Sequence, residues 1–228
     1  MALKAKTNAL KQIYQIYDDF IQTQDLICQK HCASCCTCDV TLTTLEGHMI
    51  ISALNPAEKH DLLNRLRQKA PAGRLLPDIT PNRMARLCAQ GEAFADSDRQ
   101  PVPTSCPLLN ENTCPIYEDR PFGCRSLVSH EPCENRGYAI TNDYILSVNT
   151  LFMQVIEHLD SRGRFGNLTD ILLFLETGNR AGFNPQNSLS CAGRRLIRNQ
   201  PLEVLMIPPE HRTSIQPILA SLKKITLS

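Results

Sequence analysis

Apolar residues near the start of the chain recur at the spacing of a helix. The members of this stripe are Leu10, Ile13, Tyr14, Tyr17, Phe20 and Ile21. They predict an amphipathic helix from about Thr7 that runs toward Cys28. Two capping-box sequences, Thr43-Thr44-Leu45-Glu46 and Asn55-Pro56-Ala57-Glu58, predict the starts of helices over roughly 44–54 and 56–70.

Later segments carry further helix signals of the same kind. The expected helices run from Thr80-Pro81 to Gly91, from Asn142 to near Gly163, over about 168–177 behind the cap Asn167, and from Pro209 to about Ile225 with a candidate bend at Pro217. No predicted strand is needed to account for the pattern. The chain is therefore expected to be mainly helical.

The stretch from about Phe94 to Tyr138 differs from the helical segments. It contains six prolines, which exclude a regular helix or a central strand: Pro101, Pro103, Pro107, Pro115, Pro121 and Pro132. Such a long irregular segment needs another source of order, and a bound metal supplies one because its binding free energy adds to folding. The expected fold class is mainly α, a helical domain with a long irregular Cys/Pro-rich loop organised around a metal centre. We expect a single domain over 1–228, with a cysteine-cluster metal-binding region over 7–140 and a C-terminal helical region over 141–228.

Charge and composition argue against nucleic-acid binding and against a membrane-spanning protein. Lys plus Arg number 24 against 23 Asp plus Glu, a formal net charge of +1, whereas nucleic-acid binders usually present a strongly basic face. No stretch approaches the ~20 apolar residues of a spanning helix, and the first residues lack the features of a secretory signal. We therefore expect a cytoplasmic protein that binds neither nucleic acid nor membrane, with a protein as the remaining class of partner.

Nine of the eleven cysteines fall into two clusters, Cys28, Cys32, Cys35, Cys36 and Cys38, then Cys106, Cys114, Cys124 and Cys133. Thiols stay reduced in the cytosol, so clustered cysteines indicate metal binding or redox catalysis rather than disulfides. We expect both clusters to close on one centre. The candidate metal ligands are Cys28, Cys32, Cys35, Cys36, Cys106, Cys114, Cys124 and Cys133.

The first cluster leaves several alternatives open. Cys28 lies seven residues after Ile21, so a buried thiol on the apolar stripe is the alternative to a ligand. Adjacent Cys35 and Cys36 point in different directions, so both can serve one centre only with a strained turn. The alternatives are that one of them is structural or that two metals are present. His31 is either a zinc ligand or a polar neighbour.

Three cysteines are weaker candidates. Cys38 follows the first cluster closely, but its place in the ligand set is less favoured. Cys88 and Cys191 stand alone in the sequence and are expected to be core thiols.

Two arginines, Arg120 and Arg125, bracket Cys124. They are the candidate cofactor-binding residues, because a guanidinium favours a thiolate and offsets a negatively charged centre. The alternative for Arg120 is a surface ion pair with Glu118 or Asp119, which contributes little stability.

Four segments of this chain match a known pattern: Cys32-Ala33-Ser34-Cys35-Cys36, Thr43-Thr44-Leu45-Glu46, Cys106-Pro107-Leu108-Leu109, and Cys114-Pro115-Ile116-Tyr117-Glu118-Asp119-Arg120-Pro121 ending at Cys124-Arg125. Through them, residues 28–125 resemble the CxxCxxCC zinc- or iron-chelating domain family, the YkgJ-like cysteine cluster proteins. The chain departs from that family at Cys28, which is separated from Cys32 by three residues rather than two, and at Ser34, where glycine is common. The resemblance implies a bound metal or iron–sulfur cluster.

The favoured function is a metal-binding protein that holds an iron–sulfur cluster, [4Fe–4S], with a redox or partner-docking role. Several thiols with Cys-Pro sequences and few histidines suit a cluster, but thiolates also bind zinc, so a structural zinc-binding module is the first alternative. Flagellin lysine methylases carry a similar cysteine domain, so the resemblance also implies a cluster-dependent methyltransferase-like enzyme using S-adenosylmethionine. No Gly-rich nucleotide-binding loop is found to support it. The Cys28-x3-Cys32-x2-Cys35 spacing also occurs in radical S-adenosylmethionine enzymes, but that family is built on alternating strands and helices, which this sequence does not predict.

Overall fold

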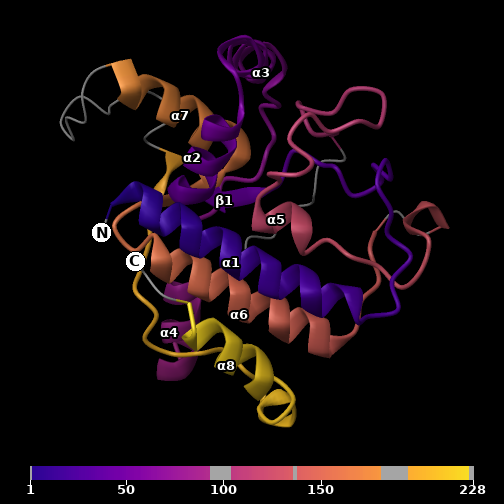
Figure 1. Cartoon of the computed structure of the whole chain (residues 1–228), viewed down its shortest axis with the longest axis vertical. Helices are drawn as coiled ribbons and strands as arrows, with labels where there is room; N and C mark the ends of the chain where they lie inside the picture. Colours follow the sequence, from indigo (N-terminus) through magenta and orange to yellow (C-terminus); the bar gives the residue numbers. More distant parts are fainter. Residues whose placement is uncertain (1, 93–103, 136–137, 181–194, 226–228) are drawn as a thin grey trace.

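The computed structural model describes residues 2–92, 104–135, 138–180 and 195–225 (Figure 1). The helices are α1 Leu3–Gln22, α2 Thr44–Ala53, α3 Pro56–Lys69, α4 Pro81–Gln90, α5 Phe122–Arg125, α6 Asp143–Leu159, α7 Leu168–Arg180 and α8 Gln216–Lys223. Short 3₁₀ turns lie at η1 Cys133–Asn135 and η3 Pro209–His211, and the strands are β1 Thr41–Thr43, β2 Arg164–Asn167 and β3 Ile197–Arg198. The expectation of a mainly α fold is confirmed in this coarse sense.

The helices predicted from capping sequences are confirmed, because the predicted caps form. Thr43 and Glu46 make a complete capping box at the start of α2, and Asn55 and Glu58 make another at the start of α3. The Asn142 side chain accepts a hydrogen bond from the backbone N–H of Ile145, at 2.8 Å, and so caps α6. These ends are determined locally, which is why the sequence predicts them well.

Two predicted helices have different ends from those expected. α1 ends at Gln22, because the polar run Gln22-Thr23-Gln24-Asp25 interrupts the apolar stripe. Cys28 is exposed beyond that end, so the alternative of a buried thiol on the stripe is wrong. The expected helix over 209–225 is divided into η3 and α8, and Pro217 lies in the first turn of α8, where its missing N–H has no cost.

A small antiparallel sheet, which the sequence analysis did not predict, joins distant parts of the chain. Its strand order is β1-β2-β3. Thr41 pairs with Asn167 and Thr43 with Phe165 between β1 and β2, and Phe165 pairs with Ile197 between β2 and β3. Strands of two to four residues are too short to show an alternating pattern.

Two apolar clusters make up the core. The α1–α6 core joins α1, α2, α5, α6 and α8, and its largest members include Tyr17, Phe122 and Phe152. The α2–α7 core joins β1, α2, α3 and α7, and takes in Leu108 and Ile116 from the irregular segment. Figure 1 shows α1 and α6 side by side, with the cysteine-bearing segments 23–40 and 104–135 gathered at one side of the molecule.

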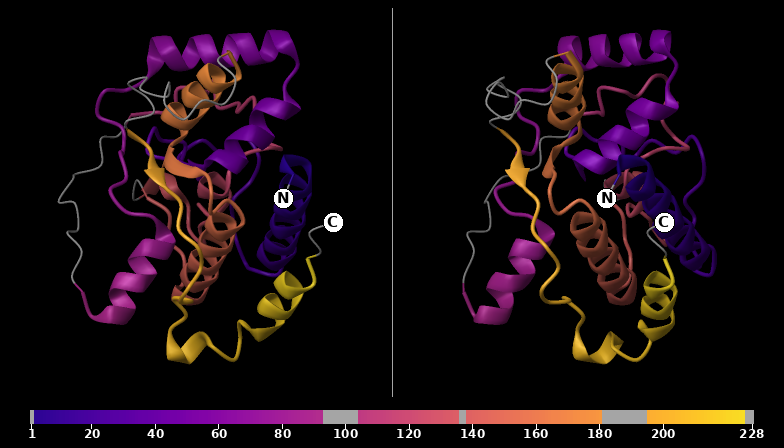
Figure 2. Two further views of the ribbon diagram at one scale, coloured as in Figure 1. Left: turned by 90° about the vertical axis from the view of Figure 1, so that its left-hand side faces the viewer. Right: turned by 60° about the vertical axis from the view of Figure 1, so that its left-hand side comes forward.

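The remaining helices lie at opposite ends of this arrangement. Figure 2 shows α3 lying next to α7 at one end, with α4 and α8 at the other. In the parts of the chain that the structure describes, none of the helices combines the length and the apolar character needed to cross a bilayer. Residues 94–103 and 136–137 of the predicted loop, together with Cys191, lie outside the described residues.

Candidate metal centre

The buried carboxylate of Glu46 links the helical core to the segment that carries Cys124. Its Oε1 accepts hydrogen bonds from the backbone N–H of Phe122 and from the Tyr14 hydroxyl, both at 2.8 Å. Its Oε2 accepts from the N–H of Thr43 at 2.7 Å and from the Thr43 hydroxyl at 2.9 Å. Burial raises the pKa of Glu46, and the bonds from Thr43, Phe122 and Tyr14 oppose that rise. One side chain thus fixes the start of α2 and the start of α5 together.

Gly123 allows α5 to approach the sheet directly. A Cβ atom at this position would lie 2.6 Å from the Thr41 carbonyl oxygen and 3.2 Å from Val40. Any larger residue would push the short helix away from β1. The adjacent Cys124 is therefore held close to the first cysteine cluster by a backbone contact that only glycine permits.

Backbone hydrogen bonds join the two cysteine clusters. The N–H of Cys106 donates to the Cys36 carbonyl at 2.8 Å, and the N–H of Cys38 donates to the Thr104 carbonyl at 2.9 Å. Thr37 and Ser105 form an antiparallel bridge between them. The expectation that the clusters, about seventy residues apart in sequence, meet in space is therefore confirmed by the contacts.

The first cluster is in turn fixed to the sheet and α7. The Asn167 side-chain amide donates to the Cys38 carbonyl at 2.8 Å, and the N–H of Leu168 donates to the Val40 carbonyl at 2.9 Å. Asn167 was predicted only as a helix cap, and its bond to the cysteine loop depends on tertiary contact.

A further contact brings in the segment that leads to Cys133. The N–H of Ile27 donates to the Ser129 carbonyl at 3.1 Å, and the N–H of Ser129 donates to the Cys28 sulfur at 3.2 Å. The Ser129 hydroxyl donates to the Glu131 carbonyl at 2.7 Å, which turns the chain toward Cys133. Cys28 and Cys133 are therefore brought to the same side of the molecule.

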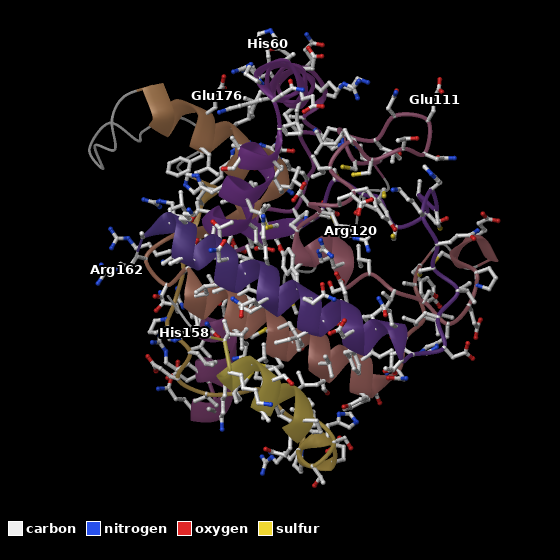
Figure 3. All side chains as sticks on the ribbon, in the orientation of Figure 1. His60, Glu111, Arg120, His158, Arg162 and Glu176 are labelled. Atoms are coloured by element: carbon white, nitrogen blue, oxygen red, sulfur yellow. The ribbon has the colours of Figure 1, made fainter. Side chains whose placement is uncertain are left out.

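All eight predicted ligand cysteines line one cavity of about 390 Å³: Cys28, Cys32, Cys35, Cys36, Cys106, Cys114, Cys124 and Cys133. None of the ten cysteines that the structure describes forms a disulfide. Apolar side chains form much of the rest of the wall, including Val40, Leu108, Ile116 and Leu168. We call this space the thiol cavity. Figure 3 shows sulfur atoms gathered on the side of the molecule where Arg120 lies.

Burial and mutual contact change the acidity of the thiols in opposite directions. Burial raises the pKa of Cys106, Cys114 and Cys124. A hydrogen bond between the side chains of Cys35 and Cys36 raises the pKa of Cys35, and the same bond lowers the pKa of Cys36. Among these five cysteines, Cys36 is therefore the one whose surroundings favour the thiolate.

Arg125 lines the thiol cavity and connects the cysteine loop to α1. Its Nη1 donates to the Asp18 carboxylate at 2.8 Å, and its Nε donates to the Arg120 carbonyl at 3.0 Å. Its Nη2 donates to the Glu118 carbonyl at 2.7 Å, and its guanidinium lies over the Tyr14 ring at 4.4 Å. Each of its three nitrogens thus has an acceptor, and these bonds hold the loop that carries Arg125, the predicted cofactor-binding residue, against α1.

Arg120 lies in the same wall but has different contacts. Its guanidinium lies over the Tyr117 ring at 4.2 Å, and its buried Nε has no hydrogen-bond partner among the described residues. Its charge lowers the pKa of Cys35, Cys114 and Cys124, although larger effects of hydrogen bonding and burial outweigh it. Of its two alternative ion-pair partners, Glu118 and Asp119, Glu118 instead pairs with Lys30 at 2.7 Å. Figure 3 labels Arg120 beside α5.

The remaining candidate residues, Cys88, Cys38 and His31, are not among those that line the thiol cavity. Cys88 is exposed on α4, so the expectation of a core thiol there is wrong. Cys38 is buried, and its sulfur lies 3.5 Å from the Asp39 carboxylate. His31 is exposed, with a backbone φ of 72°. Within the described ranges, no three histidine, cysteine, aspartate or glutamate side chains form a group that could hold a metal ion.

Comparisons with known proteins return no match to a family model, to a curated protein or to a solved structure. The resemblance of residues 28–125 to YkgJ-like proteins therefore stays a prediction. The site is interpreted from its own residues.

Proposed function

We propose that this protein holds an iron–sulfur cluster of the [4Fe–4S] type in the thiol cavity, and that the cluster serves a redox or partner-docking role. The observation that carries this proposal is the convergence of eight free thiols, from segments far apart in the chain, on one cavity. Cysteine sulfur is the donor on which iron–sulfur clusters depend. When bound, such a cluster supplies one-electron transfer at thiolate-ligated iron.

The charges in the wall fit an anionic centre. A buried N–H without an acceptor has a desolvation cost, and the Nε of Arg120 is in that position among the thiols. A negatively charged sulfur centre would accept from this group, and charged hydrogen-bond donors near cluster sulfurs help to set the reduction potential. Arg125 is already satisfied by Asp18 and the loop carbonyls, so its contribution is to hold the loop.

The exposed side of the cavity supports a docking role. Cys28 and Cys32 are exposed, and beside them Ile27 is 48% exposed and Leu127 is 38% exposed. Apolar side chains at the edge of a redox centre are typical of a surface that meets another protein. The class of partner that this favours is a protein electron donor or acceptor.

The test is to purify the protein under anaerobic conditions and measure its metal content. A brown protein with iron and acid-labile sulfide in equal amounts is the expected result. A colourless protein with stoichiometric zinc and no sulfide would instead favour the structural zinc module and overturn the cluster. The Cys88→Ser variant should keep the same metal content, because Cys88 is an exposed cysteine that does not line the cavity.

A further inference from the structure

A second cavity lies between α1, α6 and α8. Its volume is about 480 Å³, and ligand pockets in proteins span roughly 300–1,000 Å³. Its described lining residues share no member with those of the thiol cavity. A cluster bound to the thiols therefore does not account for this space. We call it the α1–α6–α8 groove.

Apolar side chains from all three helices form the floor of the groove. Ala9 and Ile13 of α1 are buried and lie one helical turn apart, so they face the groove together. Four partly buried side chains extend this surface and pack against the α1–α6 core: Val155, Leu159, Leu222 and Ile225. Their exposed parts are apolar surface that a bound apolar chain would remove from water, which is favourable.

The rim of the groove includes two cations, Lys6 and Arg162. The Nζ of Lys6 lies 3.8 Å from Oδ1 of Asp160. The other oxygen of that carboxylate accepts from the Thr44 hydroxyl at 2.6 Å and from the N–H of Leu45 at 3.0 Å. Arg162 is exposed and has no hydrogen bond or ion pair to another described residue. Its five donors are therefore available to an anion.

The elements around this rim add more positive charge. α1 carries three lysines before its first acidic residue, Asp18. The end of α8 adds Lys223 and Lys224, and that helix contains no acidic residue. Figure 1 shows the start of α1 and the ends of α6 and α8 at the same side of the molecule. Since the whole chain has a formal charge of only +1, this concentration of cations is local.

His158 is a further donor in the lining of the groove. Its Nδ1 accepts from the N–H of Leu202 at 3.0 Å, so the proton of the neutral ring lies on Nε2. Figure 3 labels His158 and Arg162 on the side where α1 begins. An N–H and a guanidinium are donors that a carboxylate accepts, and the guanidinium can bind it through two parallel hydrogen bonds.

We propose that the α1–α6–α8 groove binds a single-chain anionic amphiphile, an acyl chain that ends in a carboxylate. The carboxylate lies at the rim and accepts from Arg162, Lys6 and His158. The acyl chain lies on the apolar floor, which extends about 10 Å along α1 from Lys6 to Ile13. A hollow accepts one chain, whereas a membrane-binding surface needs apolar side chains that enter the lipid.

The first experiment titrates the purified wild-type chain with decanoate, below the concentration at which decanoate aggregates, by isothermal calorimetry. One molecule should bind to each chain. Decanol, which has the same chain without the charge, should bind at least about tenfold more weakly, because it loses the charged hydrogen bonds. In the series from hexanoate to decanoate, each added methylene should tighten binding by about fourfold.

The second experiment reverses the charge at the rim. Arg162→Glu should weaken decanoate binding by at least about tenfold, because it replaces the donors with a repelling carboxylate. Arg83→Glu is the matched control, since Arg83 is an exposed arginine of α4 that does not line the groove. It should leave the affinity unchanged. Arg162 makes no described contact that folding would lose, and circular dichroism checks that both variants fold.

Nuclear magnetic resonance locates the bound chain. Decanoate should shift the amide signals of α1, the end of α6 and the end of α8. Shifts confined to the cysteine segments would place the ligand in the thiol cavity and overturn the proposal. Absence of saturable binding would also overturn it, as would equal affinity for decanol together with no effect of Arg162→Glu. Binding only to phosphatidylcholine vesicles that contain phosphatidylserine would instead indicate a membrane surface and overturn the groove as a ligand site.

Discussion

The helical core and the cysteine region are held together by different means. In the core, α1 and α6 bury large side chains against each other, and Tyr17, Phe122 and Phe152 form a group of ring contacts with centroids 4.8–5.8 Å apart. In the cysteine region the chain has little regular structure, and a few backbone bonds such as those of Cys106 and Cys38 connect its segments. The first region is held mainly by apolar burial, and the second by a small number of backbone hydrogen bonds.

If the thiol cavity holds a metal, as proposed, removal of that metal should have the most unequal effect on the two regions. Thiolate metal sites contribute on the order of 10 kcal/mol to the folding of small domains, whereas the helical core has its own apolar contacts. Chelation should therefore remove hydrogen-exchange protection from the amides of Cys38 and Cys106 and leave that of α1 and α6 largely unchanged. Equal loss of protection in both regions would show that the core also requires the metal.

Truncation of Phe152 should instead destabilise the helical core more than the cysteine region. The residue is fully buried in the α1–α6 core, and replacement of a buried phenylalanine by alanine costs about 3–5 kcal/mol. Phe152→Ala should lower the free energy of unfolding by that amount, measured by chemical denaturation. Leu146→Ala, an exposed position on the same helix, is the control and should change stability little. A small effect of Phe152→Ala would contradict the importance given to this core.

Glu46→Gln tests the link between the two regions. The glutamine has one acceptor oxygen in place of two, so either the bonds to Phe122 and Tyr14 or those to Thr43 are lost. The expected cost is about 1–3 kcal/mol in unfolding free energy, together with faster loss of metal from the cavity. Glu58→Gln alters an exposed capping box on α3 and is the matched control. Equal effects of the two variants would show that Glu46 acts only as a helix cap.

The smallest expected effect concerns Glu157 in α6, which should make the free energy of unfolding depend on pH. Its carboxylate accepts from the N–H of Asn82 at 2.7 Å and of Gln200 at 2.6 Å, and burial raises its pKa above the usual value. A raised pKa in the folded state means that the stabilisation is complete below the unfolded pKa and is lost as the pH rises through the folded value. Comparison of unfolding free energies should show this decline in the wild type but not in Glu157→Gln. Parallel pH profiles would contradict it.

The sequence predicted the helices well because their signals are local. The capping boxes at Thr43 and Asn55 and the cap at Asn142 are formed by residues within one helical turn of each other. The prediction for α1 extended too far because the apolar stripe was continued past the polar run that begins at Gln22. Cys28 was consequently given a buried alternative that the structure excludes.

The cysteine pattern by itself predicted a set of eight candidate ligands, and these eight thiols line one cavity. Only the tertiary structure decided how they are positioned. The bond from Glu46 to Phe122, the approach of Gly123 to Thr41, and the different roles of Arg120 and Arg125 join residues far apart in sequence. Local propensity carries no information on such pairs, since their energy arises only when packing has removed water and brought the partners together.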